Sequence, residues 1–274
     1  MTELVVRRLL IDLETPFNRH WNGGDAFRSA FFNALSMSFP RGEQYFIDSV
    51  RNGWKSLPEA DRARHAAEVQ GFIGQEATHR RIHALFNGHL VKQGHLNRIE
   101  QRAQQRIEAS AHLDLRNHLA ATAATEHFTA LFADWMLRHP EALAGAEPRL
   151  QTLWLWHSAE ESEHRCTAFD IYQAAGGNQA WRVRVFRAVT VIFLTDLLRQ
   201  TMRNLRHDGC LFKWSTWRSA YQLLFTRDGL LRGNLGLWRD YLRPDFHPSQ
   251  QDATRSQQWL RDNSAQFTAL GQVG

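Results

Sequence analysis

Hydrophobic residues recur every three to four positions along most of the chain, and strict alternation of apolar and polar residues is missing. The first spacing is typical of amphipathic helices, whereas alternation would predict strands. Glycine and proline mark the ends of the periodic segments, as expected for helix boundaries. The pattern predicts an all-α protein without strands.

Glycine and proline positions place the individual helices. We expect the first helix to be interrupted at Pro40 and Gly42, because proline inside a helix lacks the backbone N–H and crowds the preceding turn. The expected helical ranges are 25–39, 43–54, 59–86, 96–108, 113–138, 149–174, 179–204, 214–225, 230–241 and 256–262.

Composition and length predict how these helices are organised. The chain has 274 residues, 43% hydrophobic and 22% charged, which excludes disordered and low-complexity classes and allows a sizeable core. We expect an N-terminal extension over residues 1–24 and a four-helix bundle over 25–178. Basic, Trp-rich helices over 179–248 would pack on that bundle, and a polar tail would follow over 249–274.

The net charge of +5 is concentrated in one region. Residues 181–243 carry 12 Lys+Arg against four acids, a balance of +8, which leaves 21 basic and 24 acidic residues elsewhere, a balance of −3. Arginine mixed with tryptophan and leucine favours a lid over the site, a homodimer interface or a peripheral membrane contact. Nucleic acid is not expected as a partner, because no recognition motif accompanies the charge and lysine is nearly absent.

Cysteine content and apolar runs bear on location. Cys166 and Cys210 cannot form a disulfide framework, and the first 20 residues contain acids and no apolar stretch. The longest apolar run, around residues 188–198, is too short for a bilayer. The prediction is a cytoplasmic protein, with peripheral association at the inner membrane face left open.

Two Glu-x-x-His motifs fall inside expected helices, Glu76 with His79 and Glu161 with His164. Residues three apart share one helix face, so the carboxylate and imidazole of each motif can converge on one metal ion. A single such motif occurs easily by chance. The pair therefore needs support from other residues.

That support comes from two single glutamates, Glu43 before the first motif and Glu126 before the second. Bundle-core di-metal carboxylate sites use one Glu from each of two helices and Glu-x-x-His from each of the other two. The interval from Glu43 to Glu76 is 33 residues and that from Glu126 to Glu161 is 35. Two matched helix hairpins would bring all six ligands together, although Glu43 could instead be an acid at a helix N-terminus.

Neighbouring residues on the same stripes suggest further roles. His83 and His157 lie one turn from the ligands, where a catalytic or supporting role competes with an ordinary core histidine. Glu160 and Glu163 are expected to point away from the Glu161 face and to be surface acids. Small residues around Glu126 would leave room beside a metal for dioxygen or substrate.

The ligand motifs, together with the residues that flank them, resemble the bacterial ferritin-like family catalogued as predicted metal-dependent hydrolases. The resemblance covers roughly residues 20–250 and implies a ferritin-like bundle with a di-metal centre. The segments that carry it are FPRGE at 39–43, QEATH at 75–79 followed by His83, EHFTA at 126–130, EESEH at 160–164 with Phe169 and Asp170, and YLRPDFHP at 241–248.

Two histidines and four carboxylates form an oxygen-rich donor set, which suits iron or manganese better than metals that prefer thiolates. We expect two iron ions, with manganese as the alternative. Similarity to ferritin-like oxidases implies an enzyme that activates dioxygen to oxidise a hydrophobic small molecule. The first alternative is a hydrolase that uses a two-metal-activated water, and the second is a non-catalytic iron-binding protein.

Overall fold

The computed structural model describes residues 4–270, and eleven α-helices account for most of them. The all-α prediction is confirmed, with the exception of one short strand pair. The helices are α1 (Ala26–Ser56), α2 (Glu59–Lys92), α3 (Arg98–Ser110), α4 (Leu115–Arg138), α5 (Pro148–His164), α6 (Thr167–Ala174), α7 (Gln179–His207), α8 (Trp214–Leu224), α9 (Leu230–Gly233), α10 (Leu235–Asp240) and α11 (Thr254–Asp262). Three 3-10 turns lie at Pro140–Leu143, Pro248–Gln250 and Ser264–Gln266.

The predicted break at Pro40 and Gly42 is wrong, because α1 continues through both residues. Proline removes the N–H that would bond the carbonyl of Ser36, four residues earlier. That carbonyl instead accepts a hydrogen bond of 2.9 Å from the side-chain amide of Asn87 on α2. A tertiary contact thus replaces the missing helical bond, and Glu43 lies inside a helix rather than at its start.

Two other expected helices are divided. The range 149–174 forms α5 and α6, separated at Arg165 and Cys166, and the range 230–241 forms α9 and α10, which meet at Asn234. The side-chain amide of Asn234 donates to the carbonyls of Leu230 and Leu131, which ties this junction to α4.

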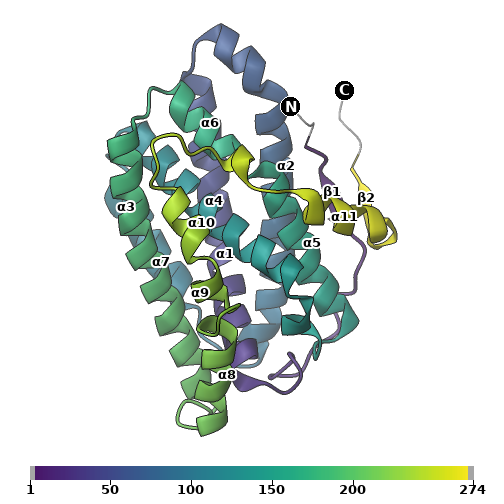
Figure 1. Cartoon of the computed structure of the whole chain (residues 1–274). Helices are drawn as coiled ribbons and strands as arrows, with labels where there is room; N and C mark the ends of the chain where they lie inside the picture. Colours follow the sequence, from purple (N-terminus) through teal and green to yellow (C-terminus); the bar gives the residue numbers. More distant parts are fainter. Residues whose placement is uncertain (1–3, 271–274) are drawn as a thin grey trace.

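The expectation of no strands is also wrong. Strands β1 (Arg7–Leu9) and β2 (Phe267–Ala269) pair antiparallel, with Arg8 opposite Thr268. Figure 1 shows this pair beside α11 at the flank of the bundle, and α11 packs against α5. Strands of three residues are too short to show alternation, so only their meeting in space reveals them.

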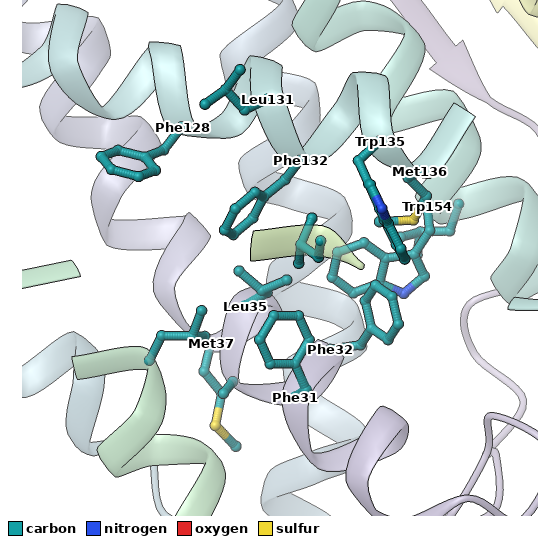
Figure 2. Packing of buried hydrophobic residues seen from close by; sticks show 14 of the residues in the cluster. Phe31, Phe32, Leu35, Met37, Phe128, Leu131, Phe132, Trp135, Met136 and Trp154 are labelled. Carbon is teal, nitrogen blue, oxygen red and sulfur yellow. The ribbon is translucent and has the colours of Figure 1, made fainter. Parts of the chain in front are cut away.

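The core lies between α1, α4 and α5. In Figure 2 the aromatic and aliphatic side chains of α1 and α4 point into a shared space, with Trp154 of α5 beside them. Phe32 and Trp154 have ring centroids 5.0 Å apart. Trp154 also packs against His83, with ring centroids 5.3 Å apart, so this part of the core lies next to the polar cluster described below.

The basic segment packs onto the bundle through α7, which contacts α1 and α4. Beyond α7, the basic segment leaves large apolar side chains exposed, including Phe212 at 94% and Trp214 at 80%. None of the helices described in residues 4–270 carries an apolar stretch long enough to cross a bilayer. Whether this surface meets a partner subunit or a membrane stays a prediction.

Candidate metal centre

Four helices direct polar side chains into the centre of the bundle. Glu43 comes from α1, Glu76 and His79 from α2, Glu126 from α4, and Glu161 with His164 from α5. All six side chains are buried. The structure therefore brings together all six residues proposed as metal ligands from the sequence.

The distances between these side chains are short enough for shared ions. Nδ1 of His164 lies 3.1 Å from Oε2 of Glu126 and 3.9 Å from Oε1 of Glu76. Nδ1 of His79 lies 3.4 Å from Oε1 of Glu161. Ligand atoms in each of three overlapping groups lie within 4.8 Å of one another: Glu43, Glu76 and His79; Glu76, Glu126 and His164; and His79, Glu161 and His164.

A carboxylate outside the predicted set orients one of the histidines. Oε2 of Glu160 lies 2.9 Å from Nε2 of His79, and Glu160 is completely buried. The expectation that Glu160 is a surface acid is thus wrong. Carboxylates often hold the second ring nitrogen of a metal-binding histidine and leave the first free for the ion. Here Nδ1 of His79 faces the cluster.

Glu160 is held in turn by Arg7, whose Nη1 lies 3.0 Å from Oε1 of Glu160 and 2.6 Å from Oε2 of Glu163. The sequence spacing could have indicated that Glu160 is buried, because it lies three residues after His157 and four before His164. That spacing places it on the same broad stripe as Glu161. No comparable signal pointed to Arg7, which is about 150 residues away.

We expect Glu160→Gln to weaken metal binding by about 10- to 100-fold, because the amide no longer provides the carboxylate that holds His79. Glu163→Gln is the matched control, since Glu163 also contacts Arg7 but does not reach His79. Competition with a metal-binding dye measures both affinities. Equal affinities in the two variants would show that Glu160 does not position His79.

His83 and His157 form a hydrogen-bonded chain that ends at the cluster. Nε2 of His157 lies 2.8 Å from Oε1 of Glu161, Nδ1 of His157 lies 2.6 Å from Nε2 of His83, and Nδ1 of His83 lies 2.9 Å from Oγ of Ser36. Because the hydroxyl of Ser36 donates to Oδ1 of Asn87, it accepts from Nδ1–H of His83, which leaves Nε2 of neutral His83 as the acceptor for Nδ1–H of His157. Glu43, His83 and His157 also form a group that could hold an ion.

Burial dominates the electrostatics of the carboxylates. It raises the pKa of Glu43, Glu76 and Glu126, and the neighbouring carboxylates raise that of Glu76 further, whereas His79 and His164 partly offset the effect at Glu43 and Glu126 respectively. Burial also acts to raise the pKa of Glu161, but His164, His157 and His79 overcome it and hold the pKa well below the usual value.

The imidazoles divide into two classes. Burial opposes charge on His79, yet Glu160 and Glu161 raise the pKa of His79 to about 10. Burial similarly opposes charge on His164, whose pKa is raised by Glu161 and Glu126. Burial lowers the pKa of His157 to about 4 and that of His83 well below its usual value. Without an ion the cluster must therefore hold protons to offset its carboxylates.

Several buried ligand atoms have no hydrogen-bond partner, which tests whether metal ions fit this site. They are both carboxylate oxygens of Glu43 and of Glu76, Oε1 of Glu126, Oε2 of Glu161, Nδ1 of His79 and Nε2 of His164. Buried polar groups are rarely left unpaired, because the lost hydrogen bonds with water cost free energy. Cations at this site would satisfy these atoms, so the residues fit a metal centre.

Two cavities adjoin the cluster on the side of α1 and α4. The smaller, of about 30 Å³, is bounded by His157, Glu161, Phe39, Thr129 and Phe193, among other residues. The larger cavity, of about 470 Å³, is also bounded by Phe39, Thr129 and Phe193 and extends between α1, α3, α4 and α7. His157 and Glu161 thus face the small cavity, and three residues of its wall also line a space large enough for an organic molecule.

Comparison with known proteins gives one match. A family model described as "Predicted metal-dependent hydrolase" matches residues 5–252 of the chain. No curated protein and no solved structure matches the chain.

Proposed function

The chain belongs to the family of predicted metal-dependent hydrolases, and from that premise we propose that its buried cluster holds two metal ions and acts on a hydrophobic substrate. The observation that carries the proposal is the set of unpartnered carboxylate and imidazole atoms that four helices bring to one buried point. The order of ligands along the chain is also that of ferritin-like di-metal bundles, and we include this fold relation in the proposal.

The chain's own residues have distinct parts in this proposal. Glu43, Glu76, Glu126 and Glu161 supply the carboxylate ligands, and His79 and His164 supply one imidazole for each ion. Two bound iron ions would supply dioxygen reduction, whereas two ions in a hydrolase would lower the pKa of a water molecule. His83 and His157 would support Glu161 through the contact of 2.8 Å between Nε2 of His157 and Oε1 of Glu161.

Of the two reactions, we propose oxidation with dioxygen first, from the donor set and the lining of the cavities. The cluster is rich in oxygen donors, which suits iron or manganese, and the adjoining cavities are mostly apolar, which suits a hydrophobic substrate. Hydrolysis is the second candidate. The family description names it directly, so the comparison supports hydrolysis more directly than it supports oxidation.

Anaerobic reconstitution with Fe(II), followed by exposure to oxygen, separates the two reactions. Oxidation predicts a change in the optical spectrum and oxygen uptake stoichiometric with bound iron. Hydrolysis predicts no oxygen uptake but turnover of an ester or phosphoester panel with Mn(II) or Zn(II). A chain that stores iron would instead take up many ions, and that result would contradict both candidates.

A further inference from the structure

The larger cavity beside the metal centre has a mostly apolar wall. Its volume is about 470 Å³, and it lies between α1, α3, α4 and α7. Its apolar lining includes Phe46, Ile99, Ile107, Leu113 and Ile192. Leu113 is 44% exposed and Ile192 is 41% exposed, so the cavity reaches the surface at these two residues.

The hydroxyl groups in the wall are already used within their own helices. Thr125 donates to the carbonyl of Ala121 and Thr129 donates to the carbonyl of Glu126, both at 2.9 Å. Ser38 and Ser110 likewise donate to carbonyls one turn earlier. None of these groups needs a bound molecule to complete its hydrogen bonding.

The larger polar side chains in the wall are also paired. The hydroxyl of Tyr45 lies 2.9 Å from Nδ1 of His118. The guanidinium of Arg106 forms an ion pair with the carboxylate of Asp196. Away from Arg106, whose half-exposed guanidinium has further N–H donors, a polar ligand would lose its hydration here without gaining a free partner, whereas an apolar ligand would lose nothing.

The inner end of the cavity approaches the metal ligands from two helices. Gly42 lines it immediately before Glu43, and Thr125 and Thr129 line it on either side of Glu126. Phe39, Thr129 and Phe193 also border the small cavity that His157 and Glu161 close. A molecule that fills the larger cavity would therefore end beside the cluster.

We propose that this cavity binds an unbranched aliphatic chain, inserted from the opening at Leu113 and Ile192 with its far end beside Glu43 and Glu126. This inference rests on the proposed function, because it names the substrate class of the same site. The apolar side chains and the internally bonded hydroxyl groups of the wall disfavour sugars, nucleotides and peptides. The polar end of such a chain would stay at the opening, in contact with water.

Gly42 offers a way to block the inner end of the cavity without disturbing the fold. A Cβ atom placed there meets only Cζ of Phe46, at an ordinary contact distance of 3.8 Å. Gly42 lies inside α1, where a larger residue also has a higher helix propensity than glycine. Gly42→Leu would place its side chain in the cavity, and Gly42→Ala is the matched control with the smallest addition.

Titration calorimetry with n-octanol, n-decanol and n-dodecanol on the metal-loaded chain tests the proposal. We expect about fourfold tighter binding for each added methylene, until the cavity is full. Gly42→Leu should weaken the binding of n-dodecanol by at least about tenfold, and Gly42→Ala should change it by less than about threefold. Hexaethylene glycol, a polar chain of comparable length, should not bind.

A second apolar groove provides a control for non-specific binding. It lies between α7 and α8, and Leu198, which is 53% exposed, lines it. Leu198→Trp should leave the affinity for n-dodecanol unchanged. Loss of binding in Leu198→Trp, or wild-type binding in Gly42→Leu, would place the aliphatic chain elsewhere and overturn the proposal.

Metal content, measured on each protein, separates this inference from the proposed function. A wild-type chain that holds two ions and binds no alkanol overturns the aliphatic-chain site and leaves the metal centre standing. A chain that binds alkanols with the expected response to Gly42→Leu but holds no metal supports the aliphatic-chain site and overturns the proposed function.

Discussion

Glu76→Gln and Glu126→Gln should each lower the metal content from two ions per chain to one or fewer. Each variant removes an anionic ligand from the group that includes His164. Loss of a supporting group alone weakens metal affinity by about 10- to 100-fold, so loss of a ligand should cost at least about 100-fold. Mass spectrometry of metals after gel filtration measures the ratio, and Glu59→Gln, on the exposed first turn of α2, is the control.

The same two variants should have the opposite effect on the stability of the metal-free chain. Burial disfavours the charged forms of Glu76 and Glu126, and a neutral amide avoids that cost. We expect the free energy of unfolding of the metal-free variants to rise by about 1–3 kcal/mol at pH 8, measured by urea denaturation. Reduced stability combined with full metal content would contradict the ligand assignment.

Metal removal should make the stability of the chain strongly dependent on pH. Burial raises the pKa of Glu43, Glu76 and Glu126, and neighbouring carboxylates raise that of His79 to about 10. His79 keeps its proton in the folded state at pH values where the unfolded chain has lost it, and the three carboxyls keep theirs to higher pH in the folded than in the unfolded state. Their contribution to stability is fully present below the unfolded pKa values and is lost as pH rises through the folded ones.

His83 and His157, whose pKa values are lowered, do not contribute between about pH 7.5 and 9, because they are neutral there in both folded and unfolded states. Each excess proton in the folded state lowers the free energy of unfolding by about 1.4 kcal/mol per pH unit. Urea denaturation with a chelator should show this decline. Metal-loaded protein should show a flat or rising profile, since ions replace the protons. If the free energy of unfolding of the metal-loaded and the metal-free protein declined in parallel with pH, that result would argue against metal binding at the cluster.

The sequence was a good guide wherever the information is local. Helical periodicity located most of the helices, and capping residues such as Asp25 and Asn178 accept hydrogen bonds at two of the helix starts. The two Glu-x-x-His motifs share helix faces for purely geometric reasons. Their repeat with Glu43 and Glu126 was enough to identify the six side chains that the structure brings together.

Contacts between distant segments decided the rest. Pro40 remains helical because Asn87, on another helix, replaces the lost hydrogen bond. Glu160 is buried because α2 and the N-terminal segment cover the face of α5 that a single helix would leave open, so that His79 and Arg7 become its partners. The apolar cavity exists because α3 and α7 stand against α1 and α4 beside the cluster.

The sequence by itself thus determined the helices and the set of candidate ligands, because periodicity and motif spacing are properties of a single helix. The tertiary structure decided which nitrogen of His79 faces the cluster, which ligand atoms lack partners, and that an apolar cavity ends beside them. These properties depend on how residues far apart in the sequence are packed, such as His79 and Glu160, which are 81 positions apart, and no pattern along one segment specifies that packing.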